Sequence, residues 1–169
     1  MRALVLSIGI IIFVVAAIIA IFLTFSSIQQ KTEDTQEFRN IKSQLETCND
    51  KLLSSATSGS TSSCTFSANR GEISVEGDSI YYKIVTEAEL CTDTDWTPLN
   101  VEKNIYQSCI ISGSSRLFQM RWNSRTILFQ TIGGLIGKVS GIEISKNRDL
   151  EVSVDGKPIR GALLNIRKF

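Results

Sequence analysis

The sequence of 169 residues predicts an α+β fold, with a long N-terminal α-helix followed by an antiparallel β-meander sheet or small sandwich. Three patterns predict it: an uncharged apolar run at the start, an apolar stripe at helical spacing after it, and period-two alternation between turn residues in the remainder. We accordingly divide the chain into a transmembrane or filament-core helix (1–25), an amphipathic helix packing on the β-domain (26–56), a Ser/Thr-rich linker (57–64) and an extracytoplasmic antiparallel β-domain (65–169).

The apolar run extends from Ala3 to Phe25 without a charged residue. A helix of this length spans roughly 33 Å, which matches the hydrocarbon core of a bilayer. The run is much longer than the about 7–15 residues of a secretory h-region, so a retained signal-anchor is favoured over a cleaved signal peptide. The residues expected to contact lipid or other subunits are Leu4, Val5, Leu6, Ile8, Ile10, Ile11, Ile12, Phe13, Val14, Val15, Ile18, Ile19, Ile21, Phe22 and Leu23.

Charge indicates an orientation for this span. Arg2 and the α-amino group precede it, whereas Lys31 and Arg39 after it are offset by three acidic residues. The positive-inside bias therefore predicts a single-pass membrane protein with its N-terminus inside and its C-terminal domain outside. An extracellular filament is the other location considered.

A helical stripe follows the apolar run. Apolar residues recur at spacings of three and four, and no proline precedes them, which predicts one continuous helix of about 50 residues. Packing of this stripe on the chain's own sheet is favoured over oligomerisation, because the stripe covers barely two heptads. The stripe residues are Phe38, Ile41, Leu45, Cys48 and Leu52, and the residues expected on other faces are Lys31, Glu37, Lys42, Glu46 and Asp50.

Four cysteines, Cys48, Cys64, Cys91 and Cys109, all follow the apolar run. An even number in an extracytoplasmic domain predicts two disulfides, with free buried thiols and a zinc site as alternatives. A zinc site would need four scattered thiolates, since there is no Cys-x-x-Cys pair and no histidine. We favour the sequential pairing, Cys48 with Cys64 and Cys91 with Cys109, because each bond closes a short polar excursion.

From Thr65 onward the pattern predicts about seven to nine short strands in a meander. Ile142, Ile144, Leu150, Val152 and Val154 are expected on the buried face, beneath the helix stripe. The expected strands are 72–75 and 79–85 around Glu76-Gly77-Asp78, 106–111 and 116–122 around Ser112–Ser115, 126–132 after a turn at Asn123-Ser124, 141–145 and 150–154 around a turn at 146–149, and 157–167 after Asp155-Gly156.

No motif indicates catalysis, a cofactor or a small-molecule substrate, so we expect a protein that is not an enzyme. Acids and bases are interspersed, which argues against a nucleic-acid surface. The stretch 131–137 lacks the Lys-Ser/Thr pair of a phosphate loop and is interpreted as a mobile glycine loop. The acidic cluster Glu87, Glu89, Asp93 and Asp95 suits either a calcium site or a solvated loop, and the latter is favoured because EF-hand spacing is absent.

This layout resembles the type IV pilin family, which includes pseudopilins, archaeal pilins and archaellins. The resemblance implies that residues 1–25 pack in a filament core after assembly, that residues 29–53 cover the sheet of the head, and that Cys91–Cys109 bounds a surface loop. Val5 replaces the glutamate usual in bacterial members, so the archaeal members are the closer match. The implied function is that of a subunit or minor subunit of a surface filament, with the bilayer and copies of itself or related subunits as partners. The alternative is a bitopic membrane protein whose β-domain binds a partner in an envelope assembly.

Overall fold

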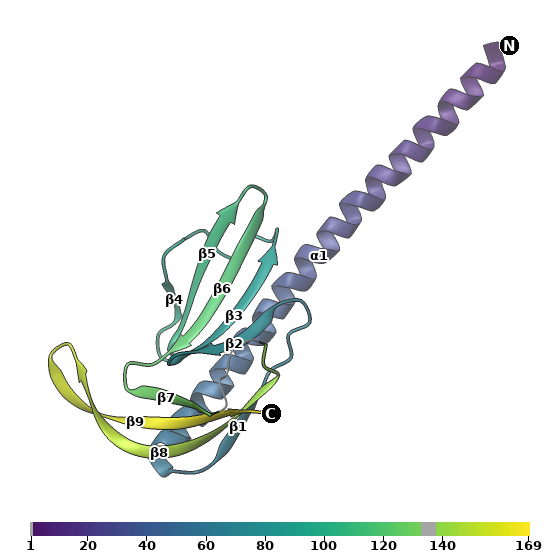
Figure 1. Cartoon of the computed structure of the whole chain (residues 1–169). Coiled ribbons are helices and arrows are strands. Elements are labelled where there is room, and N and C mark those ends of the chain that lie inside the picture. The colour runs from purple at the N-terminus through teal and green to yellow at the C-terminus, as the bar shows by residue number, and fades with distance from the viewer. Residues whose placement is uncertain (1, 133–137) are drawn as a thin grey trace.

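A computed structural model describes residues 2–132 and 138–169, with side chains described from Ile12 in the first helix. Helix α1 (Arg2–Ser58) is a single α-helix of 57 residues. Its N-terminal half projects alone from the head, and its C-terminal half lies against the strands (Figure 1). The α+β layout and the continuous helix are therefore confirmed. The stretch 131–137, expected to be a glycine loop, falls mostly outside the described residues.

One sheet has five strands in the order β2-β3-β6-β5-β4, and all of its pairs are antiparallel. Two of the predicted hairpins form within it, β2 with β3 and β5 with β6. The short edge strand β4, which contains Pro98, did not stand out in the sequence. The strand bounds are β2 (Glu72–Glu76), β3 (Ser79–Thr86), β4 (Thr97–Asn100), β5 (Ile105–Ser112) and β6 (Ser115–Asn123).

The second sheet has four strands in the order β1-β8-β9-β7. Strand β1 (Ser62–Thr65) shortens the predicted linker, because the helix continues to Ser58 and the strand begins four residues later. Strands β8 (Gly141–Val154) and β9 (Lys157–Lys168) form a long hairpin that curves away from the helix (Figure 1). Asp155 and Gly156, both at positive φ, form its two-residue turn as predicted.

Strand β7 (Ile127–Ile132) departs from the expected meander. Asn123-Ser124 was expected to turn the chain back along β6, but β7 instead joins the other sheet and pairs in parallel with β9. Phe129 lies at this crossing: its ring stacks on Trp122 of β6 at 5.3 Å, and its N–H donates to Asp78 at 2.6 Å. These contacts hold β7 across the junction of the two sheets.

Strand β8 corrects a second expectation. The predicted turn at 146–149 is a β-bulge within one strand, because the pairing with β9 shifts by one residue between Lys146 and Arg148. A shift of one residue transfers every following side chain to the opposite face. Ile142 and Ile144 therefore face the helix and are fully buried, but Leu150, Val152 and Val154 lie on the outer face and are only half-buried.

The hydrophobic core lies between the C-terminal half of α1 and both sheets, and α1 contacts β1, β8 and β9 of one sheet and β3 and β6 of the other. Trp122, Tyr82 and Phe118 are its largest fully buried side chains. A single helix thus covers two sheets, which explains why one apolar stripe suffices to build the head.

Candidate functional site

The N-terminal half of α1 carries the residues predicted to contact lipid or other subunits. From Ile12 to Phe25 every described side chain is exposed, with Phe13 at 75% and Phe22 at 70%. Four consecutive residues, 12–15, cover a whole helical turn and are all apolar. The described part of α1 is long and apolar enough to cross a membrane once. For Leu4, Val5, Leu6, Ile8, Ile10 and Ile11 the structure describes only the helical backbone.

The predicted stripe is confirmed on the C-terminal half. Ile41, Leu45 and Leu52 are fully buried. Phe38 is half-buried and meets the edge of the Phe118 ring, with centroids 5.0 Å apart. The stripe therefore packs on the chain's own sheets, as the sequence favoured.

The prediction that Glu37 lies on a helix face away from the sheet is wrong. Its side chain faces the sheet and is only 7% exposed. Its carboxylate accepts hydrogen bonds from the backbone N–H groups of Asn69 at 3.2 Å, Arg70 at 3.0 Å and Gly71 at 2.9 Å, and from the Tyr82 hydroxyl at 2.8 Å. Because four donors replace the water it loses, this buried charge is satisfied. Glu37 thus fixes the loop before β2 to the helix.

Asp34, one turn earlier, is fully buried beside Glu37. It accepts hydrogen bonds from the Arg70 guanidinium and the Thr86 hydroxyl. Burial, together with the hydrogen bond to Glu37, raises the pKa of Tyr82 well above its ordinary value. We call these residues, Asp34, Glu37, Arg70, Tyr82 and Thr86, the polar joint.

Asn49 provides a second polar contact further along the helix. It is fully buried and accepts hydrogen bonds from the Trp122 indole N–H at 3.0 Å and the Asn104 amide at 3.3 Å. Asp34, Glu37 and Asn49 continue the apolar stripe at spacings of three and four. This spacing could have identified the three polar residues as buried. They were missed because only apolar residues were considered when the stripe was defined.

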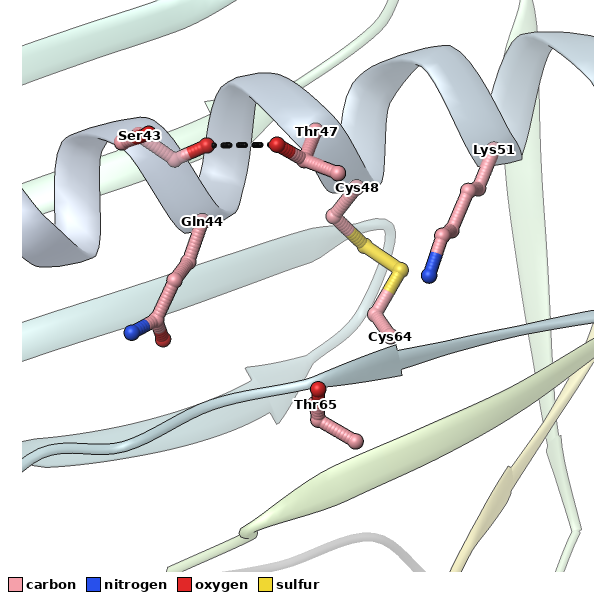
Figure 2. Close-up of a pocket in the computed structure, with 7 residues that line it drawn as sticks. All are labelled: Ser43, Gln44, Thr47, Cys48, Lys51, Cys64 and Thr65. Carbon is pink, nitrogen blue, oxygen red and sulfur yellow. Dashed lines mark hydrogen bonds between the residues drawn. A yellow bond between two sulfur atoms is a disulfide. The ribbon is translucent and has the colours of Figure 1, made fainter.

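Both predicted disulfides form. Cys48–Cys64 joins α1 to β1, with Cα atoms 5.4 Å apart, and Figure 2 shows it beside a cavity of about 150 Å³. Lys51 lines this cavity and donates to the Ser63 carbonyl at 2.6 Å, on the chain segment that carries Cys64. The bond therefore fastens the last third of the helix to the four-stranded sheet.

The second disulfide, Cys91–Cys109, links the loop after β3 to β5, with Cα atoms 6.0 Å apart. The backbone N–H of Cys109 also donates to the Asp93 carbonyl at 2.8 Å. Glu87, Glu89, Asp93 and Asp95 are all exposed on this loop. Within residues 2–132 and 138–169, no group of three or more His, Cys, Asp or Glu residues is placed to hold a metal ion.

Comparisons of the chain with protein-family models, with curated proteins and with solved structures found no match. The geometry defines a head of two sheets fixed to the C-terminal half of a long helix; in the other half, the described segment from Ile12 to Phe25 is almost entirely apolar and exposed. The functional interpretation therefore depends on what covers that exposed half.

Proposed function

We propose that this chain is a non-enzymatic structural protein of the cell envelope, a pilin-like subunit or minor subunit of a surface filament. Before assembly, α1 crosses the bilayer with its N-terminus inside and the head outside. In the filament, the apolar half of α1 packs against the same segment of other copies or of related subunits.

One observation carries the proposal: the described segment Ile12–Phe25, which is exposed on every side of the helix and apolar except for Thr24, continues without a break into the half of α1 that is fixed to the head. Lipid alone would satisfy the exposed half. The polar joint begins only nine residues after Phe25, so it fixes the head to the helix close to the exposed segment. A simple membrane anchor does not need its head held in a fixed position on the helix. Packing of helices between copies would therefore also fix the positions of the heads.

The two disulfides support a head outside the cytoplasm, since such bonds persist in oxidising compartments. The balance of charges around the span favours the same side.

The test is to shear the surface of cells that make the full chain and to examine the sheared fraction by electron microscopy with an antibody against the head. We expect labelled filaments. A Phe13→Ala/Phe22→Ala variant keeps an apolar span, so it should still insert in the membrane, but it loses the two most exposed of the described phenylalanines of the helix and should yield far fewer filaments. Val101→Ala, which truncates a side chain that is 67% exposed on the head, is the control and should assemble normally.

The alternative, a bitopic membrane protein whose head binds a partner, predicts a different result. The wild-type chain would remain in the membrane fraction, dissolve in detergent as a monomer and be missing from sheared material. That result would exclude the filament proposal.

A further inference from the structure

The end of the β5–β6 hairpin is uncharged and carries exposed apolar side chains on both faces. Residues 106–115 include no Asp, Glu, Lys or Arg. Ile110 and Ile111 are consecutive in β5, so they point to opposite faces of the sheet, and they are 53% and 50% exposed. Residues 112–115 form the turn, in which Ser112 pairs with Ser115. We call residues 110–115 the hairpin end.

The apolar surface of the hairpin end extends across the sheet. Val85 pairs with Leu117, which pairs with Ile110, so the three side chains form one row over β3, β6 and β5. This row lies on the face turned away from α1, because the neighbouring Phe118 points to the core. Val85 is 64% exposed. The hairpin end is therefore part of a larger apolar surface.

Contacts between α1 and β6 give the position of the hairpin end along the helix axis. Phe118 meets Phe38, and Trp122 donates to Asn49, so β6 runs along α1 with its first residues toward the exposed segment (Figure 1). The turn precedes Phe118 by four to five residues, which is roughly 15 Å of strand. The same distance is about ten residues of helix, so the turn lies level with about Ile28.

The expected membrane span ends close to this level. Phe25 is the last residue of the apolar run, and Lys31 is the first charged residue after it. Ile28 follows Phe25 by three residues, which is about 5 Å of helix. The headgroup layer on each side of the hydrocarbon core is about 5–7 Å thick. With Phe25 at the edge of the hydrocarbon core, the hairpin end therefore reaches the headgroup layer.

We propose that the hairpin end lies in the headgroup layer of the bilayer that α1 crosses, and so gives the head a second contact with the membrane. Its isoleucines leave water there, and its uncharged turn avoids the cost of desolvating an ionised group. Two contacts also fix the rotation of the head about the helix axis. The inference rests on the membrane-spanning part of the proposed function, which the filament subunit and the bitopic alternative share.

Charges near the hairpin end favour neutral headgroups over anionic ones. Glu87 and Glu89 are exposed directly after β3, beside the start of β6, with which β3 pairs. Arg116 pairs with Glu89 at 3.2 Å and offsets only one of the two charges. On the helix at this level, Lys31 is balanced by Glu33. A negative membrane surface would therefore repel this end of the head.

The test reconstitutes the full chain in phosphatidylcholine vesicles and measures depth with the fluorophore NBD on a single new cysteine. The native cysteines are all paired, so only the new thiol reacts. Ser114→Cys labels the hairpin end, Phe22→Cys labels the span, and Ser153→Cys labels an exposed position on the β8–β9 hairpin, at the opposite end of the head (Figure 1). Nitroxide lipids labelled at the headgroup should lower the Ser114→Cys signal by about twofold. Lipids labelled on the acyl chain should quench Phe22→Cys, and neither should quench Ser153→Cys.

A pair of variants tests whether the isoleucines make the contact. In the Ser114→Cys chain, Ile110→Asn/Ile111→Asn should reduce quenching to the level of the label at the opposite end of the head. Val101→Asn/Ile159→Asn makes the same change at exposed positions away from the hairpin end and should leave quenching unchanged. Near-UV circular dichroism of each preparation shows that the head is folded. Equal quenching in both variants would contradict the role of the hairpin end.

A second arm tests the preference for neutral lipid. Replacing about a third of the phosphatidylcholine by phosphatidylglycerol should weaken quenching of the Ser114→Cys label. Glu87→Gln/Glu89→Gln in the same chain should restore it. Stronger quenching on the anionic vesicles would contradict the preference.

The labels distinguish failure of this inference from failure of the proposed function. Quenching at Phe22→Cys without quenching at Ser114→Cys would overturn the inference and leave α1 as a membrane span. Quenching at Ser114→Cys that disappears when the chain is diluted in excess lipid would also overturn it, because a second copy would then cover the hairpin end. No quenching at Phe22→Cys would overturn both the span and the inference. Quenching as expected, with no filaments in sheared material, would exclude the filament proposal alone.

Discussion

The two halves of α1 have the same backbone but opposite relations to their surroundings. From Ile12 to Phe25 each described side chain is exposed, although nearly all are apolar. From Asp34 to Ser55 the buried side chains include a carboxylate pair, an amide and a hydroxyl. Apolar character therefore does not determine which half is buried; the presence of a complementary partner within the chain does.

The buried polar groups each find that partner in the head. Glu37 accepts four hydrogen bonds, Asp34 accepts from a guanidinium and a hydroxyl, and Asn49 accepts from an indole and an amide. The described segment from Ile12 to Phe25 has no carboxylate or amide side chain, and its one hydroxyl, that of Thr24, donates to carbonyls of its own helix. The comparison implies that the C-terminal half sets the stability of the head, whereas the N-terminal half sets location and assembly.

Truncating one apolar residue in each half of α1 tests this division of roles most directly. Leu45→Ala truncates a fully buried side chain of the hydrophobic core and should lower the free energy of unfolding of the head by about 2–5 kcal/mol. Phe22→Ala removes a larger side chain that is 70% exposed and should leave it unchanged. Thermal unfolding of the full chain in detergent, followed by near-UV circular dichroism, measures both. Equal losses would contradict the division of roles.

The disulfide between α1 and β1 offers a second test. Cys48→Ala/Cys64→Ala opens a loop with a sequence separation of 16 residues, which should cost about 3 kcal/mol by the chain-entropy argument. Retention in the membrane should not change, because the exposed half is untouched. Denaturant unfolding and membrane fractionation of the same preparation check both parts, and loss of membrane retention would show that the halves are coupled.

The sequence predicted those features of the structure that are determined by the spacing of residues close together in the chain. The continuous helix, the stripe from Phe38 to Leu52 and three hairpins follow from periodicity and turn residues. Both disulfides follow from the short excursions that they close. These features depend on residues close together in the chain.

The features that the sequence did not predict depend on distant contacts. The parallel pairing of β7 with β9 is accompanied by the stacking of Phe129 on Trp122 across the sheet junction, a contact that involves residues of both sheets. The bulge at Lys146/Arg148 changes no local pattern but reverses the face of Leu150, Val152 and Val154. Glu37 is buried because three backbone N–H groups converge on it from a loop more than thirty residues later.

The polar joint predicts a smaller effect. Tyr82→Phe removes the hydroxyl that donates to Glu37, a hydrogen bond to a buried charged group, and should cost about 1.5–3 kcal/mol. The protein should also become less sensitive to alkali. Because burial raises the pKa of Tyr82, the unfolded chain loses its phenolic proton near pH 10 while the folded chain retains it.

Stability of the wild-type chain should therefore be full below about pH 10 and fall as the pH rises further, by up to about 1.4 kcal/mol per pH unit from this group. Unfolding titrations between pH 8 and pH 12 in detergent measure the slope. The slope should be shallower for Tyr82→Phe, and identical slopes would show that Tyr82 does not titrate differently in the two states.

The smallest effect is expected where α1 meets the head at the surface. Lys103 donates to Asp50 at 2.6 Å, and this hydrogen bond lowers the pKa of Asp50, but both side chains are partly exposed. Lys103→Ala should therefore cost less than about 1 kcal/mol, and the difference should shrink further at high salt. Asn49 precedes Asp50 in the helix. Asn49→Ala removes the side-chain amide that accepts from the Trp122 indole N–H, leaves that buried N–H unpaired, and should cost about 1–3 kcal/mol at any salt concentration. Denaturant unfolding of both variants at low and high salt distinguishes the two contacts. A larger loss of unfolding free energy for Lys103→Ala than for Asn49→Ala would mean that surface charge, rather than the buried groups, fixes the helix to the head.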